Sequence, residues 1–207
     1  YSLDPSDCAN KIVSPEIVMV VIGGDSRTFE LNNFPIRFTQ GTRTGATAVF
    51  PSQNLVDAFE TVAGYKVTLT DSGWTSEDPA FNPSDPYSGR DPRFYRTVLA
   101  NGMQFKGSEI ELFEGGMDDA EVVSGGSPTG YFLRRYIQES TDFTPSKLVT
   151  NKHHWIVYRY AETLLSYAES MANAFPSDMN YTDFEYPYSA LWALNQVRTN
   201  AGMPPVP

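Results

Sequence analysis

A chain of 207 residues with 41% hydrophobic and 19% charged residues can bury one sizeable core or two small ones, which argues against wholesale disorder. The formal net charge is −10, and no cluster of Lys and Arg is dense enough to follow a phosphate backbone, which argues against nucleic acid as a partner. Cys8 is the only cysteine, so the sequence offers neither a disulfide framework nor a thiolate metal cluster.

The first residues, Tyr1-Ser2-Leu3-Asp4, are neither an initiator methionine nor a signal peptide, so the sequence is interpreted as a piece of a longer protein. No apolar run approaches the ~20 residues that a helix needs to span a bilayer. Residues 15–22 form a short, β-branched run closed by Gly23-Gly24, which predicts a buried strand or extended segment. Residues 23–50 show no sustained period and are typical of a loop.

The middle of the chain predicts short helices separated by long loops. Pro51-Ser52 offers a helix cap, and Gly64 ends the helix. Residues 70–90 are dense in Gly, Pro, Asn and Asp and predict a second loop. Asp91-Pro92 suits the N-cap and first position of another helix, and residues 102–130 form a third irregular stretch. In the helix that Pro51-Ser52 caps, the predicted apolar side consists of Leu55, Val56 and Phe59.

The chain changes character after Trp155, where apolar residues recur at spacings of four and three and predict a long helix. A second helix is predicted from Ser189 to Ala201, with Gly202 and Pro204 as its stop. Small alanines on both stripes favour a close antiparallel pair. The first stripe consists of Val157, Ala161, Leu164, Ala168 and Met171, and the second of Ala190, Leu194, Val197 and Ala201.

Five separate stretches, in the same order, resemble the SusD/RagB family. They are residues 51–60, 90–95, 130–136, 155–169 and 194–204, the last ending in Ala201-Gly202-Met203-Pro204. The resemblance implies a mainly α, SusD-like fold of tetratricopeptide-like helix pairs with a large lobe of irregular loops and short strands. Residues 1–150 would form the irregular ligand-binding lobe, and residues 151–207 a helix pair.

The same resemblance implies a function without catalysis. Members of the family bind glycans or similar nutrients at the bacterial outer membrane and deliver them to a SusC-like TonB-dependent transporter. The chain resembles the middle of such a protein, so the lipid anchor that would attach the whole to the outer-membrane surface would lie outside it. An oligosaccharide or polysaccharide is therefore the expected ligand.

Few residues suit catalysis or metal binding. His153 and His154 are the only histidines, and adjacent side chains diverge, so both are interpreted as structural or surface residues. The acids from Glu109 to Asp119 could supply a carboxylate pair for glycoside hydrolysis or oxygen ligands for calcium. A solvated acidic loop is the favoured interpretation, because 25 acidic residues bring some together by chance. No cofactor is predicted.

Two groups of charged residues are interpreted as scaffold. Arg90-Asp91-Pro92-Arg93 places two guanidinium groups beside a carboxylate that can cap a helix, which predicts buried pairing that fixes a loop to the helical body. Arg159 and Glu162 are three residues apart on the predicted long helix and are likewise interpreted as scaffold.

Aromatic residues on loops give the remaining functional signal. A sugar presents a face of C–H groups beside a rim of hydroxyls, so its site needs flat rings and planar hydrogen-bonding groups. The helices use their apolar stripes for packing, so rings that contact ligand should lie on loops. The predicted ligand-binding residues are Asn33, Phe34, Arg37 and Phe38 on the first loop, and Trp74 and Tyr87 on the second.

Two alternatives stay open. One is a helical-repeat scaffold whose ligand is a peptide or protein, and the other is a glycan-active hydrolase. A glycan array separates the first from glycan binding, and product analysis tests the second.

Overall fold

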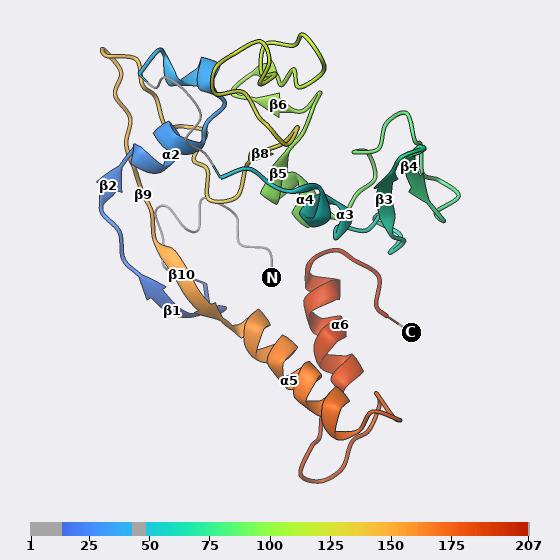
Figure 1. The fold of residues 1–207 in the computed structure, drawn as a ribbon. Coiled ribbons are helices and arrows are strands. Elements are labelled where there is room, and N and C mark those ends of the chain that lie inside the picture. Colours follow the sequence, from blue (N-terminus) through green and yellow to red (C-terminus); the bar gives the residue numbers. More distant parts are fainter. Residues whose placement is uncertain (1–13, 43–48, 207) are drawn as a thin grey trace.

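The structure is a computed structural model that describes residues 14–42 and 49–206. Cys8 and residues 43–48 of the first predicted loop lie outside the described residues. Short strands and helices fill one end of the described part, and a long helical hairpin forms the other (Figure 1).

Ten strands form five two-stranded antiparallel sheets within the described residues. Two of these sheets join the beginning of the chain to the segment just before the long helices, so residues far apart in sequence lie side by side (Figure 1). The pairs are β1 (Ile17–Val21) with β10 (Trp155–Arg159), β2 (Asp25–Ser26) with β9 (Asn151–Lys152), β3 (Val67–Thr70) with β4 (Gly73–Ser76), β5 (Val98–Leu99) with β8 (Phe132–Leu133), and β6 (Gln104–Phe105) with β7 (Ser108–Glu109).

Strand β1 confirms the strand predicted for residues 15–22, but its predicted burial is wrong. Val18, Met19, Val21 and Ile22 are 53–71% exposed. The strand pairs with β10 alone, and a two-stranded ribbon has two faces to cover. The part of the chain that the structure describes leaves much of this apolar surface open.

Both predicted short helices form where their caps lie. Helix α3 (Gln53–Asp57) begins after Ser52, whose Oγ accepts a hydrogen bond from the Leu55 N–H at 3.4 Å. It ends well before Gly64, and of the predicted stripe Val56 is buried, Phe59 half-buried and Leu55 exposed. Helix α4 (Pro92–Thr97) begins after Asp91, whose Oδ1 accepts from the Arg93 N–H at 2.8 Å.

Helices α5 (Tyr160–Ala174) and α6 (Ala190–Asn200) form the predicted antiparallel pair (Figure 1). Leu164, Ala168 and Ala193 form its buried contact, and Leu194 and Val197 pack against them. The predicted start of the first helix is wrong, because Val157 belongs to β10, where strand pairing with β1 replaces the helical period.

Arg159 is part of the scaffold, as predicted, but it lies at the end of β10 and not on the long helix. Arg159 is the N-cap residue of α5, and its Nη1 contacts Glu16 Oε1 at 3.2 Å, ahead of β1. Burial of the Glu16 carboxyl raises its pKa, and the Arg159 guanidinium opposes that shift. This pair therefore joins the N-terminal strand to the start of the helical hairpin.

The contact between α5 and α6 should contribute measurably to the free energy of unfolding. We expect Leu164→Ala to lower the free energy of unfolding by about 2–3 kcal/mol, since Leu164 is 5% exposed and its removal leaves a cavity. Leu165→Ala is the matched control, because Leu165 is the next residue and is exposed, and a change within ~0.5 kcal/mol is expected. Denaturant titration of the full-length protein measures both, and equal effects would contradict the burial of Leu164.

Two larger apolar clusters stabilise the strand-rich end. The first surrounds Phe34 and Phe132, and includes side chains from α2 (Thr28–Asn33) and the 3₁₀ helix η1 (Ile36–Thr39). The second surrounds Val56, Phe94 and Tyr131. Five α-helices and ten short strands give the described residues a mixed content, and the mainly α, tetratricopeptide-like description stays a prediction. No helix among the described residues combines the length and apolarity needed to cross a membrane.

Candidate functional site

The six predicted ligand-binding residues fall into two groups in the structure. Asn33, Phe34 and Phe38 belong to or adjoin the first apolar cluster, and Arg37 lies beside them on η1. Trp74 and Tyr87 pack against the second cluster. The two predicted loops therefore contribute to different parts of the lobe. Their packing does not favour one site shared by both loops.

Phe34 and Asn33 are core residues, so their prediction as ligand contacts is wrong for this structure. Phe34 is 0% exposed, and the edges of Phe105 and Phe143 meet its ring at centroid distances of 5.0 and 5.7 Å. The buried Asn33 amide donates to Phe29 O at 2.8 Å and accepts from Val49 N at 3.0 Å. Neither side chain presents a free group to a ligand.

Arg37 and Phe38 are half-buried and are engaged with protein. The Arg37 guanidinium lies 4.7 Å from the Phe38 ring centroid and makes a 2.8 Å ion pair with Asp118, and it also donates to Glu109 O. Phe38 packs against Phe105 at a centroid distance of 5.0 Å. These contacts connect η1 to the third irregular stretch, which gives Arg37 a structural role.

Trp74 and Tyr87 are brought together, as the second loop prediction requires. Trp74 lies on β4 and meets the Tyr87 ring edge-on at 5.7 Å between centroids. Tyr87 in turn stacks on Phe94, at 6.0 Å and an interplanar angle of 19°. Both rings are half-buried, so they sit at the boundary between core and solvent.

A chain of hydrogen bonds links Tyr87 to α3 and β3. The Tyr87 and Tyr131 hydroxyls are 3.5 Å apart, and Tyr131 donates to Gln53 Oε1 at 2.8 Å. Gln53 Nε2 donates to Asp57 Oδ1 at 2.7 Å, and the same oxygen accepts from Leu69 N at 3.4 Å. Burial raises the pKa of both tyrosines, so their hydroxyls remain protonated donors.

An open cavity of about 410 Å³ lies between α3 and β3, next to this chain. It is within the size range of small-molecule sites. Its walls offer an amide, two carboxylates, an ammonium and a hydroxyl, which can donate to and accept from sugar hydroxyls. The lining residues are Asn54, Asp57, Ala58, Glu60, Lys66 and Thr68. We call Trp74, Tyr87 and this cavity the hairpin site.

The cavity residues were not predicted from the sequence, although one signal was available. Asn54, Asp57 and Glu60 follow one another at three-residue spacing, which places polar groups on one side of a short helix and the turn after it. Lys66 and Thr68 join them only because β3 folds back beside α3.

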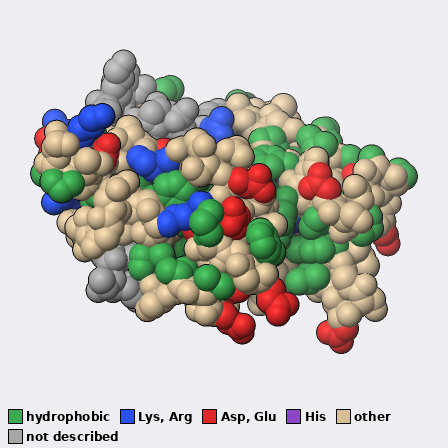
Figure 2. Space-filling model, turned by 90° about the horizontal axis from the view of Figure 1, so that it is seen from above, with side chains coloured by type: hydrophobic (Ala, Val, Ile, Leu, Met, Phe, Trp, Pro, Cys, Tyr) green, Lys and Arg blue, Asp and Glu red, His purple; other side chains and the backbone are tan. Residues whose placement is uncertain are grey.

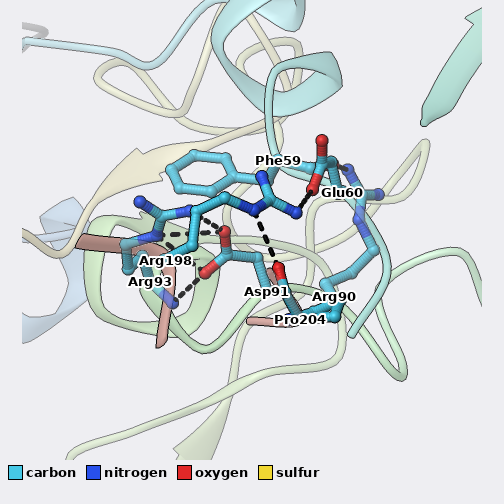
Figure 3. Close-up of polar contacts among 7 residues, drawn as sticks. All are labelled: Phe59, Glu60, Arg90, Asp91, Arg93, Arg198 and Pro204. Atoms are coloured by element: carbon cyan, nitrogen blue, oxygen red, sulfur yellow. Dashed lines mark hydrogen bonds and ion pairs between the residues drawn. The ribbon is translucent and has the colours of Figure 1, made fainter. Parts of the chain in front are cut away.

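The edge of the cavity is anchored to the helical hairpin (Figure 3). Glu60 makes a 2.8 Å ion pair with Arg198 of α6, and Arg198 Nε donates to Pro204 O at 2.9 Å. Asp91 pairs with Arg93 through both carboxylate oxygens. The predicted fixing of a loop to the helical body is thus made by Arg198, while Asp91 and Arg93 stabilise the start of α4.

Arg90 has a different role from the predicted ion pair. Its guanidinium is buried and donates to Pro86 O at 3.0 Å, Val56 O at 2.8 Å and Phe59 O at 2.7 Å. It lies 5.1 Å from the Phe94 ring centroid and 6.0 Å from that of Trp74. Burial lowers its pKa. Arg90 therefore stabilises the backbone around the hairpin site by donating hydrogen bonds to three carbonyl groups.

Four further candidate catalytic residues are engaged in structural contacts. His153 Nε2 contacts the buried Glu30 carboxylate at 2.8 Å, and His154 Nδ1 accepts from Gly23 N at 3.3 Å. Asp118 is buried against Arg37, and Asp119 accepts from the N–H groups of Gly115 and Glu121. Across residues 14–42 and 49–206, no three His, Cys, Asp or Glu side chains are grouped as metal ligands.

The face seen in Figure 2 shows how charge is distributed around the lobe. Lys and Arg side chains gather toward the end formed by β2 and β9, whereas the end with β3 and β4 carries hydrophobic and acidic side chains. A ligand without negative charge suits the second end best.

Comparison with known proteins gives consistent matches. The model of the SusD family matches residues 15–207. A crystal structure of a SusD-like protein from Bacteroides fragilis superposes with a TM-score of 0.65 and 24% identity, over 94% of this chain and 38% of that one. A SusD-like carbohydrate-binding protein from the same organism gives 0.57 and 26%, over 92% of this chain and 35% of that one. No curated protein matches the sequence.

The described residues therefore have the fold of the corresponding part of SusD-like structures, and the chain spans less than two fifths of the length of either.

Proposed function

The chain belongs to the SusD family, and on that premise we propose that it is part of a protein that binds glycans without altering them. The bound glycan would be held at the bacterial outer-membrane surface and passed to a SusC-like TonB-dependent transporter. Membership of the family is the observation that carries this proposal. One of the two similar structures is itself a carbohydrate-binding protein.

The hairpin site has the chemistry that this function needs. Trp74 supplies a half-buried ring for the C–H face of a sugar, and the cavity between α3 and β3 supplies hydrogen-bonding groups for the hydroxyls. Asp57 lines the cavity and belongs to the hydrogen-bond chain that leads to Tyr87, which connects the two parts through the protein, while Trp74 and Thr68 lie on opposite faces of the β3–β4 pair. We place the ligand contacts of this chain there.

Asp118 and Asp119, two of the acids considered for hydrolysis, do not have the environment of a glycosidase pair. A glycosidase needs an accessible acid with a raised pKa across from a second carboxylate. Burial does raise the pKa of Asp118, but its carboxylate is enclosed and paired with Arg37. Asp119 has its pKa lowered by the backbone N–H groups of Gly115 and Glu121. The surroundings of these two carboxylates are therefore those of residues with a structural role.

The experiment is calorimetry of the full-length protein with a panel of neutral oligosaccharides, followed by product analysis. We expect binding without release of reducing sugar. Trp74→Ala should weaken binding roughly fivefold, the equivalent of ~1 kcal/mol for one stacked ring. Lys66→Ala should also weaken it, and because Lys66 is exposed its loss leaves the core intact.

Phe113→Ala is the control, since it removes an exposed ring from the third irregular stretch. Unchanged affinity in both Trp74→Ala and Lys66→Ala would place the ligand elsewhere. Binding of peptides in place of every sugar would favour the protein-binding alternative, and steady sugar release abolished by a single carboxylate change would favour the hydrolase.

A further inference from the structure

The connection between α5 and α6 lies at the end of the helix pair that points away from β3 and β4 (Figure 1), and it carries a group of exposed aromatic side chains. The connection between α5 and α6 and the first turn of α6 carry Phe184, Tyr186, Tyr188 and Trp192, which we call the aromatic tip. All four are exposed, and Phe184 is as open as in an extended chain. Such rings usually contribute to a core or to a binding surface.

Hydrogen bonds give the aromatic tip a fixed shape. Asp183 Oδ1 accepts from the N–H groups of Glu185 and Tyr186 at 2.9 and 2.6 Å, and its Oδ2 accepts from the Tyr181 hydroxyl at 2.7 Å. Tyr181 also stacks on Phe175, at 3.8 Å between centroids. The rings therefore project from an ordered loop, so binding a ligand would not cost the entropy of ordering that loop.

The tip contains a stacked pair of exposed aromatic rings. The Tyr188 and Trp192 rings stack at 4.2 Å with an interplanar angle of 23°, and they are 51% and 38% exposed. Tyr167 fixes this pair from α5 by donating its hydroxyl to Tyr188 O at 2.6 Å. A stacked, half-exposed ring pair of this kind matches the C–H face of a sugar ring.

Charge decides which kind of ligand fits. Residues 175–189 contain Asp178, Asp183 and Glu185 but no Lys or Arg. The carboxylates can accept hydrogen bonds from hydroxyl groups, and they repel anionic ligands and anionic lipid head groups. Rings and carboxylates alternate from Asp183 to Tyr186, whereas a protein interface would favour a contiguous patch with few charges at its centre.

We propose that the aromatic tip is a second saccharide contact, which stacks the sugar rings of a neutral polysaccharide on Tyr188 and Trp192. This inference rests on the proposed glycan binding and extends it to a surface outside the irregular lobe. Two contacts on one protein raise the retention of a long chain more than that of a short oligosaccharide. The tip therefore predicts a dependence on ligand length that the hairpin site alone does not.

The test is affinity electrophoresis of the full-length protein in gels containing starch, xylan or mannan, with polygalacturonate as the anionic comparison. We expect at least one neutral polysaccharide to retard the wild-type protein. Tyr188→Ala and Phe184→Ala should each weaken that retention, by roughly fivefold for Tyr188, the loss of one stacked ring. The effect on a short oligosaccharide measured by calorimetry should be much smaller.

Phe113→Ala controls for the loss of an exposed ring, and thermal melting confirms that each variant is folded. Wild-type retention that Tyr188→Ala and Phe184→Ala leave unchanged overturns the tip while the proposed function stands. No retention of the wild type by any sugar overturns both. Unchanged retention together with loss of a co-purifying protein in the tip variants would instead identify a protein interface.

Discussion

Phe34→Ala is expected to lower the free energy of unfolding by about 3–5 kcal/mol, the loss typical of a large buried ring. Phe34 has no exposed surface, and it holds together segments from three parts of the chain through Phe105 and Phe143. The cavity left behind cannot be filled by neighbours that are themselves packed. Denaturant titration of the full-length protein gives the change from the midpoint and slope.

Phe113→Ala is the matched control for Phe34→Ala, since Phe113 is exposed and should change stability by no more than ~0.5 kcal/mol. A Phe34→Ala protein as stable as the wild type, with weakened glycan binding, would return Phe34 to the ligand site and contradict its place in the core.

Arg90→Met is expected to cost about 3 kcal/mol or more and to weaken glycan binding as well. The substitution keeps much of the apolar stem but removes the donors of three backbone carbonyls, and each buried carbonyl left unpaired costs about 1–3 kcal/mol. The Arg90 guanidinium also lies beneath Trp74 and Phe94, so those rings lose a support. Chemical denaturation and calorimetry measure the two effects.

Arg135→Met is the matched control for Arg90→Met. Arg135 is exposed and its guanidinium lies 5.0 Å from the Tyr136 ring centroid, so its loss should stay within ~0.5 kcal/mol. If Arg90→Met unfolds at the same denaturant concentration as Arg135→Met, the carbonyl contacts carry no net stability. Arg90→Lys should restore only part of the loss, because a lysine lacks the planar fork of donors.

The elements whose signals are local could be predicted from the sequence. Ser52 and Asp91 cap helices that begin one residue later, because a cap acts within the first turn. The stripes on α5 and α6 were also predictable, since residues three and four apart share a face whatever the rest of the chain does. The family resemblance rested on short stretches of the same kind and is confirmed.

The tertiary structure alone decided which loop residues are buried. Phe34 has no periodic neighbours, and its burial depends on Phe105 and Phe143, 71 and 109 positions later. Val157 fits a helical stripe but lies in a strand, because β1 pairs with its segment from the other end of the chain. The cavity between α3 and β3 likewise needs both elements in place. Periodicity reports the neighbours within a few residues, whereas burial and cavities depend on distant partners whose identity no local pattern carries.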